Sequence, residues 1–122
     1  MDQWFHLLII IIIALFLWSR FKPAVGVNQI SMKDLKEIVQ RKPKSVQFVD
    51  VRTPAEFNGN HMKGFMNIPL DQLNNQIANL NKDQEVIVIC QSGMRSSNAS
   101  KILKKHGFAH ITNVKGGMSA WR

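Results

Sequence analysis

The sequence predicts an α/β domain with three layers and a mostly parallel central sheet, preceded by one transmembrane helix. Short β-branched runs alternate with segments of helical periodicity between residues 29 and 122. One run, Val86–Ile89, is apolar at every position, which is typical of a parallel strand buried on both faces. Ahead of this pattern, residues 4–18 are apolar except for His6. The chain therefore divides into an anchor with its basic flank (1–22), a tether (23–28) and one domain (29–122).

The apolar N-terminal run indicates a membrane anchor. Trp4 and Trp18 stand where interfacial aromatic side chains belong. Fifteen helical residues rise about 22 Å, less than the roughly 30 Å hydrocarbon core, so flanking residues must complete the span. A cleaved signal peptide fits less well, because the first residues include Asp2 and no Lys or Arg. Arg20 and Lys22 follow the run, which predicts a single-pass membrane protein whose catalytic domain faces the cytoplasm.

The first half of the domain is expected to contain two helices and two strands. Ser31 and Thr53 are the expected N-caps of the first and second helix, and Pro54 fits the first turn of the second. Pro69 ends the second strand, which is the weaker of the two. In chain order the predicted elements are a helix at Met32–Gln40, a strand at Val46–Val51, a short helix at Thr53–Phe57 and a strand at Met66–Ile68.

The second half of the domain repeats this alternation. Leu70, Leu73, Ile77 and Leu80 recur at helical spacing, and Gly107 is the expected C-terminal cap of the next helix. The predicted elements are a helix at Leu70–Leu80, a strand at Val86–Ile89, a helix at Ser96–His106 and a strand at Ile111–Val114.

Cys90 is the only cysteine in the chain, so an internal disulfide and a four-cysteine zinc site are both excluded. It follows a buried strand directly, and ligands of parallel α/β sheets bind outside the carboxyl ends of the strands. A glycine-containing loop, a helix N-terminus and Arg95 come next, and all three favour a thiolate. The alternative is an inert buried cysteine, but burial alone does not require an anion-binding loop beside the thiol.

The formal net charge of +8 does not indicate nucleic-acid binding, because no reader motif is present and aromatic residues are not interleaved with the basic ones. Lys101, Lys104 and Lys105 are interpreted first as a solvated helix face, and second as a surface that meets anionic lipid.

Four motifs in order resemble the single-domain rhodanese family of sulfurtransferases. They are Asp50-Val51-Arg52 with Glu56-Phe57, His61 through Pro69, Val86 through Cys90 with the loop to Arg95, and Gly116-Gly117 with Ala120-Trp121. The resemblance covers nearly all of residues 29–122. Phe65 departs from it, since the family most often has alanine there.

The resemblance implies a ping-pong cycle in which the Cys90 thiolate takes sulfur from a small anionic donor such as thiosulfate and carries it as a persulfide. An external thiol, on a small molecule or a protein, then accepts the sulfur, and no cofactor or metal is implied. The donor would be bound by Gln91, Ser92, Gly93, Met94, Arg95 and Ser96.

Asp50 and Arg52 are expected to support this loop as charged scaffolding, and Arg52 could pair with Glu56 four residues on. His61 could orient a substrate, but a histidine fixed by a backbone carbonyl is the favoured interpretation.

Two other functions stay open. A phosphatase or arsenate reductase of related fold would need Cys-x5-Arg, whereas this chain has Cys-x4-Arg. A membrane-tethered, non-catalytic binding module is the second alternative, and the presence of Cys90 argues against it.

Overall fold

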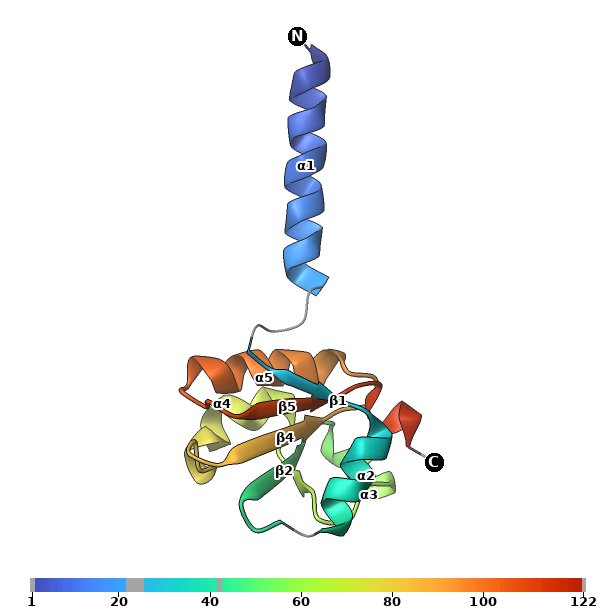
Figure 1. The fold of residues 1–122 in the computed structure, drawn as a ribbon, viewed down its shortest axis with the longest axis vertical. Helices are drawn as coiled ribbons and strands as arrows, with labels where there is room; N and C mark the ends of the chain where they lie inside the picture. The colour runs from blue at the N-terminus through green and yellow to red at the C-terminus, as the bar shows by residue number, and fades with distance from the viewer. Residues whose placement is uncertain (1, 22–25, 42, 122) are drawn as a thin grey trace.

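A five-stranded sheet with helices on both faces follows the N-terminal helix α1 (Figure 1). The structure, a computed structural model, describes residues 2–21, 26–41 and 43–121, so half of the predicted tether, residues 23–25, lies outside the described residues. The strands are β1 (Asn28–Ile30), β2 (Val46–Asp50), β3 (Met66–Asn67), β4 (Glu85–Ile89) and β5 (Ile111–Val114). The α-helices are α1 (Asp2–Phe21), α2 (Met32–Gln40), α3 (Pro54–Gly59), α4 (Leu73–Gln76) and α5 (Met94–Lys105). Three short 3-10 helices are η1 (Leu70–Gln72), η2 (Ile77–Asn79) and η3 (Gly117–Ala120).

Every strand pair of the sheet is parallel, in the order β1-β5-β4-β2-β3. The central strand β4 pairs with β2 through Val88 and Val49, and with β5 through Val88 and Asn113. The predicted parallel sheet is therefore confirmed. Its topology brings the carboxyl ends of β2 and β4, and so Asp50 and Cys90, to neighbouring positions at one edge.

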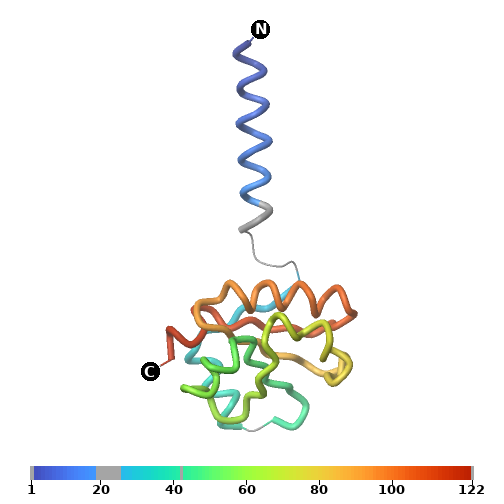
Figure 2. Tube along the Cα trace, turned by 180° about the vertical axis from the view of Figure 1, so that it is seen from behind, coloured from blue at the N-terminus to red at the C-terminus, as the bar shows by residue number. Residues whose placement is uncertain are grey.

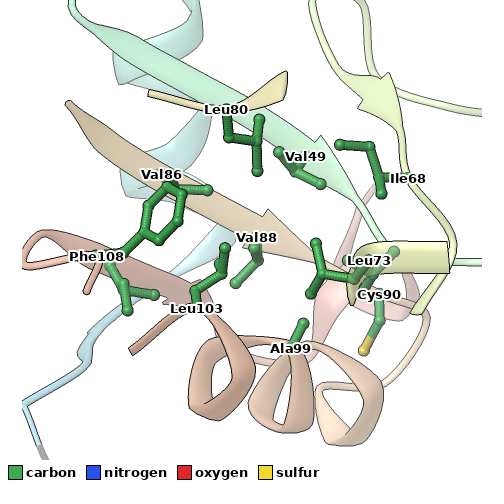
Figure 3. Packing of buried hydrophobic residues seen from close by; sticks show 12 residues of the cluster. Val49, Ile68, Leu73, Leu80, Val86, Val88, Cys90, Ala99, Leu103 and Phe108 are labelled. Carbon is green, nitrogen blue, oxygen red and sulfur yellow. The ribbon is translucent and has the colours of Figure 1, made fainter. Parts of the chain in front are cut away.

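Each face of the sheet carries its own hydrophobic cluster, as the continuously apolar β4 requires. Val86 and Val88 pack with Leu103 of α5 on one face, and Figure 3 shows Leu73 of α4 in the same cluster. Ile87 and Ile89 point to the opposite cluster, which includes residues of α2. Figure 2 shows α5 from behind, lying across its face of the sheet. The three-layer prediction is confirmed.

The predicted helix caps and most predicted elements also agree with the structure. The Ser31 side chain accepts a hydrogen bond from the Asp34 N–H at 3.1 Å, and Thr53 caps α3 in a reciprocal capping box with Glu56. Gly107 follows α5 with a φ of +91°, the left-handed conformation expected after a helix C-terminus.

The helix predicted at Leu70–Leu80 is wrong in kind, because this segment forms η1, α4 and η2 in succession. Apolar residues three apart suit a 3-10 helix as well as an α-helix, and Asn74, Asn75 and Asn79 compete with helical backbone hydrogen bonding. The strand β1 and the terminal η3 were not predicted, since three or four residues carry too little periodicity to identify them.

The N-terminal apolar run does form a helix, α1, whose apolar side chains are exposed; Trp4 and Trp18 are 74% and 71% exposed. Among the residues that the structure describes, however, no helix has the length and apolarity needed to cross a membrane. The predicted transmembrane helix at residues 1–22 is therefore not confirmed.

Candidate active site

Cys90 lies directly after β4, at the carboxyl edge of the sheet, with its side chain completely buried. In Figure 3 its sulfur lies at one end of the cluster, close to the start of α5. The Sγ atom accepts a hydrogen bond from the Gly93 N–H at 2.9 Å. Gly93 precedes α5 with a φ of +107°, which favours glycine. The thiol therefore faces the N-terminus of a 12-residue helix, where N–H groups and the helix dipole attract anions.

Ser96 is the second polar neighbour of the thiol. Its hydroxyl oxygen lies 3.3 Å from Cys90 Sγ and donates a hydrogen bond to the Gly93 carbonyl at 3.1 Å. One turn later, the buried Ser100 hydroxyl donates to the Ser96 carbonyl at 2.8 Å instead of contacting the sulfur. Ser96 was predicted to bind the donor, but it is fully buried and contacts the nucleophile itself.

The C-terminal segment η3 is hydrogen-bonded to the backbone of the Cys90 loop. The Met118 N–H donates to the Cys90 carbonyl at 2.8 Å, and the Ser119 N–H donates to the Gln91 carbonyl at 2.9 Å. A Cβ atom at Gly117 would lie 2.1 Å from the Cys90 carbonyl oxygen, so only glycine allows this close approach. The absence of a side chain at Gly117 therefore lets η3 hold the backbone of the cysteine in place.

Asp50 and Arg52 form a buried pair beside the loop, as predicted for supporting residues. The Arg52 guanidinium binds both carboxylate oxygens of Asp50 at 2.9–3.1 Å and the Asn60 carbonyl at 2.6 Å. Its Nη1 lies 3.5 Å from Oε1 of Gln91, which links the pair to the loop. The suggested pairing of Arg52 with Glu56 is wrong. Asp50 and Arg52 lie two residues apart on extended backbone, which places their side chains on the same side.

Glu56 instead binds Arg95, the last charged residue of the loop. Nη1 and Nη2 of Arg95 donate to Oε1 and Oε2 of Glu56 at 2.6 and 2.9 Å, a bidentate ion pair about one third exposed (34 and 32%). The hydrogen bonds from Arg95, followed by that from the Thr53 N–H, lower the pKa of Glu56 to about 2. The hydrogen bonds between Arg95 and Glu56 also raise the pKa of Arg95.

The other predicted residues are placed as follows. Gln91, Ser92 and Met94 are exposed on the loop, with Met94 70% exposed. His61 stacks on Phe57, and its Nδ1 lies 2.8 Å from the Phe57 carbonyl oxygen, the fixed role favoured from sequence. Glu56 is the residue whose role at the loop the sequence reasoning missed, because its partner lies 39 positions away.

No cluster that could hold a metal ion occurs in the described part of the chain. A cavity of about 360 Å3 lies beside Leu80, Lys82 and Phe108, residues that flank the amino end of β4 rather than its carboxyl end. The chemistry available at Cys90 is therefore that of a single buried thiol that contacts the Gly93 N–H and the Ser96 hydroxyl, with two ion pairs beside its loop.

Comparisons with known proteins agree with this geometry. The sequence profile of the rhodanese-like domain family matches residues 31–122. The chain is 34% identical over 116 residues to the uncharacterized protein YqhL of Bacillus subtilis, covering 95% of this chain and 92% of that protein. It is 35% identical over 94 residues to the thiosulfate sulfurtransferase GlpE of Shewanella oneidensis, covering 77% and 91% of the two chains. A rhodanese-like domain protein from Staphylococcus aureus superposes with a TM-score of 0.72 at 31% identity, over 79% of this chain and 92% of that one.

Proposed function

This chain belongs to the rhodanese-like domain family, and on that basis we propose that it is a sulfurtransferase that carries sulfane sulfur as a persulfide on Cys90. The observation that carries the proposal is the position of the Cys90 sulfur, which faces the Gly93 N–H at the start of α5. A thiolate there is held by the helix N-terminus and aligned by the rigid end of β4.

The first half-reaction moves one sulfur atom. The Cys90 thiolate attacks the outer sulfur of the donor, the new Cys90 S–S bond forms, and the bond from that sulfur to the rest of the donor breaks. With thiosulfate, sulfite leaves with the electron pair and Cys90 holds a persulfide. The N–H groups of the loop stabilise the negative charge on the persulfide.

The second half-reaction needs a thiol from outside the chain, because Cys90 is the only cysteine. The acceptor thiolate attacks the outer persulfide sulfur, takes it as a new persulfide, and returns Cys90 as a thiolate. Atoms and electrons balance in both steps without a cofactor. We propose that Gln91, Ser92, Gly93 and Met94 contact the donor, since they directly follow Cys90 and are exposed or half-buried.

The test is an intact-mass measurement of the full chain after incubation with thiosulfate. We expect a gain of one sulfur atom, about 32 Da, which a thiol acceptor removes. Cys90→Ser should show neither the adduct nor thiocyanate formation with cyanide. Sulfur transfer at the wild-type rate in Cys90→Ser would refute the mechanism, and a wild-type protein that never gains sulfur would favour a non-catalytic module.

We further propose that α1 holds the protein at a membrane with the domain on the cytoplasmic side. The exposed apolar side chains of α1 support association with an apolar environment. Arg20 and Lys22, which follow the apolar run in the sequence, support the orientation. Carbonate extraction of membranes and protease added to intact cells test the two parts. Recovery of the intact protein in the fraction without membranes would refute membrane association. Cleavage of the domain by protease outside intact cells would refute the cytoplasmic orientation.

A further inference from the structure

The two guanidinium groups beside the Cys90 loop are both bound by carboxylates. Arg52 is bound by Asp50, and Arg95 is bound through two nitrogens by Glu56. Sequence reasoning treated Arg95 as a free cation for an anionic donor. In the structure its charge is instead balanced within the ion pair before any donor arrives.

Glu56 is held in place by contacts that do not depend on Arg95. Its Oε1 accepts hydrogen bonds from the Thr53 N–H at 3.1 Å and the Thr53 hydroxyl at 3.0 Å. The Glu56 N–H in turn donates to the Thr53 hydroxyl oxygen at 3.2 Å. Because this capping box fixes the start of α3, the carboxylate is a stationary counter-charge. With a pKa of about 2, Glu56 stays ionised at every physiological pH.

Arg95 is also within electrostatic reach of the nucleophile. It lies in the second position of α5, five residues after Cys90. The largest influence raising its pKa is the hydrogen bonding to Glu56, and the charges of Cys90 and Asp50 add smaller contributions of the same sign. A change in the net charge of the Arg95 pair is therefore felt at the sulfur.

We propose that Glu56 is a specificity-determining residue that, by neutralising Arg95, selects sulfur donors of low charge, organic hydropersulfides (R–S–SH), over dianionic thiosulfate. The inference rests on the proposed sulfur transfer through Cys90 and assigns the class of its donor. Glu56 acts through Arg95, so it is a positioning residue for a charge and touches no reacting atom.

The charges of the two donors explain the selection. A thiolate repels a dianion more strongly than it repels a neutral or singly charged donor, since Coulomb repulsion scales with the product of the charges. The hydropersulfide reaction, Cys90–S⁻ + R–S–SH → Cys90–S–SH + R–S⁻, brings one negative charge to the loop when the donor is protonated and two when it is ionised. The thiosulfate reaction, Cys90–S⁻ + S–SO3²⁻ → Cys90–S–S⁻ + SO3²⁻, brings three negative charges to the loop. It is therefore favoured by a nearby cation whose charge no carboxylate neutralises.

The decisive variant is Glu56→Gln. Glutamine keeps a side-chain oxygen for Thr53 and retains the capping box, while it removes the charge that balances Arg95. We expect kcat/KM for thiosulfate to rise by about tenfold, the scale of one charge-assisted contact. For benzyl hydropersulfide, which carries at most one negative charge, kcat/KM should change by less than about twofold. The readouts are sulfite release, benzyl thiol release and the mass of the Cys90 adduct.

Glu85→Gln is the matched control. Glu85 begins β4 and accepts a hydrogen bond from the Thr112 hydroxyl at 2.8 Å. Its replacement by glutamine changes the net charge of the protein by the same amount as Glu56→Gln. Five residues of extended strand separate it from Cys90, roughly 17 Å, which exceeds the screening length of about 8 Å at physiological salt. Its donor preference should stay that of the wild-type protein.

The outcomes separate this inference from the proposed function. A wild-type protein that prefers thiosulfate to benzyl hydropersulfide, or equal effects of Glu56→Gln and Glu85→Gln, would overturn the role of Glu56. A thiosulfate gain that persists in Glu56→Gln/Arg95→Ala would also overturn it, because the gain must come from Arg95. The wild-type preference decides the question even if a variant fails to fold. If neither donor places sulfur on wild-type Cys90, the proposed function fails and this inference fails with it.

Discussion

Replacing Gly117 by alanine perturbs the contact between η3 and the Cys90 loop at one point. The added Cβ would lie 2.1 Å from the Cys90 carbonyl oxygen and 2.9 Å from two backbone carbons, none of which can rotate away. Reaching ordinary contact at 3.4 Å from 2.1 Å requires the loop and η3 to separate by about 1.3 Å. That movement weakens the hydrogen bonds from Met118 and Ser119 to the loop carbonyls.

Gly116→Ala isolates this effect from the cost of positive φ. Both glycines are left-handed, with φ of +72° and +54°, but a Cβ at Gly116 meets only the Ala120 Cβ at 3.3 Å. The left-handed cost of about 1–2 kcal/mol is therefore common to both variants. Overpacking at Gly117 adds about 1–3 kcal/mol, and each lost hydrogen bond adds about 1. With both hydrogen bonds lost, we expect Gly117→Ala to be less stable than Gly116→Ala by about 3–5 kcal/mol.

Two assays test this prediction. Urea unfolding gives the free energy of unfolding of both variants, with similar slopes if each remains two-state. Sulfur transfer at a donor concentration well below KM reports the loop geometry, and a displacement near 1 Å should lower kcat/KM of Gly117→Ala by about a hundredfold. If Gly117→Ala matches Gly116→Ala in both stability and activity, η3 does not position Cys90.

Two further predictions follow from the polar neighbours of the site. Ser96→Ala should slow sulfur transfer by roughly tenfold, because its hydroxyl lies 3.3 Å from Cys90 Sγ, and Ser100→Ala should slow it by less than about twofold; equal losses would indicate a packing effect. The depressed pKa of Glu56, about 2 when folded against 4.5 for the free group, gives stability that is present above pH 4.5 and lost as pH falls through 2. Because the pair with Arg95 is about one third exposed, the loss should be on the order of 1 kcal/mol, visible in urea unfolding at pH 6 and pH 2 and absent in Glu56→Gln.

Features set by neighbouring residues could be predicted from the sequence. The continuous apolar character of Val86–Ile89 identified a doubly covered strand, and the strand-to-helix junction after it identified Cys90 as the candidate nucleophile. Ser31 and Thr53 act as N-caps because a cap depends on residues three positions away. In each case the cause and its effect lie within one turn or one strand.

Features that join distant segments could not be predicted in the same way. The partner of Arg95 is 39 residues away, and only the packing of α3 beside α5's N-terminus selects Glu56 from the acidic residues available. The i to i+4 spacing suggested Glu56 as a partner for Arg52, but that rule applies within a helix and Arg52 precedes α3. Gly117 reaches Cys90 because β5 pairs with β4, a neighbour relation that topology decides.

The complete burial of the Cys90 side chain governs how the site meets oxidants. Peroxides convert a thiolate stepwise to sulfenic, sulfinic and sulfonic acids, and each step requires the oxidant to reach the sulfur. A second cysteine often traps the first product as a reversible disulfide, but this chain has none. Shielding by the Gly93 backbone and Ser96 takes that protective role. In the proposed reaction the acceptor thiol must reach the same buried sulfur, so a substitution that opens the loop should speed both the oxidation of Cys90 and sulfur transfer to bulky thiols.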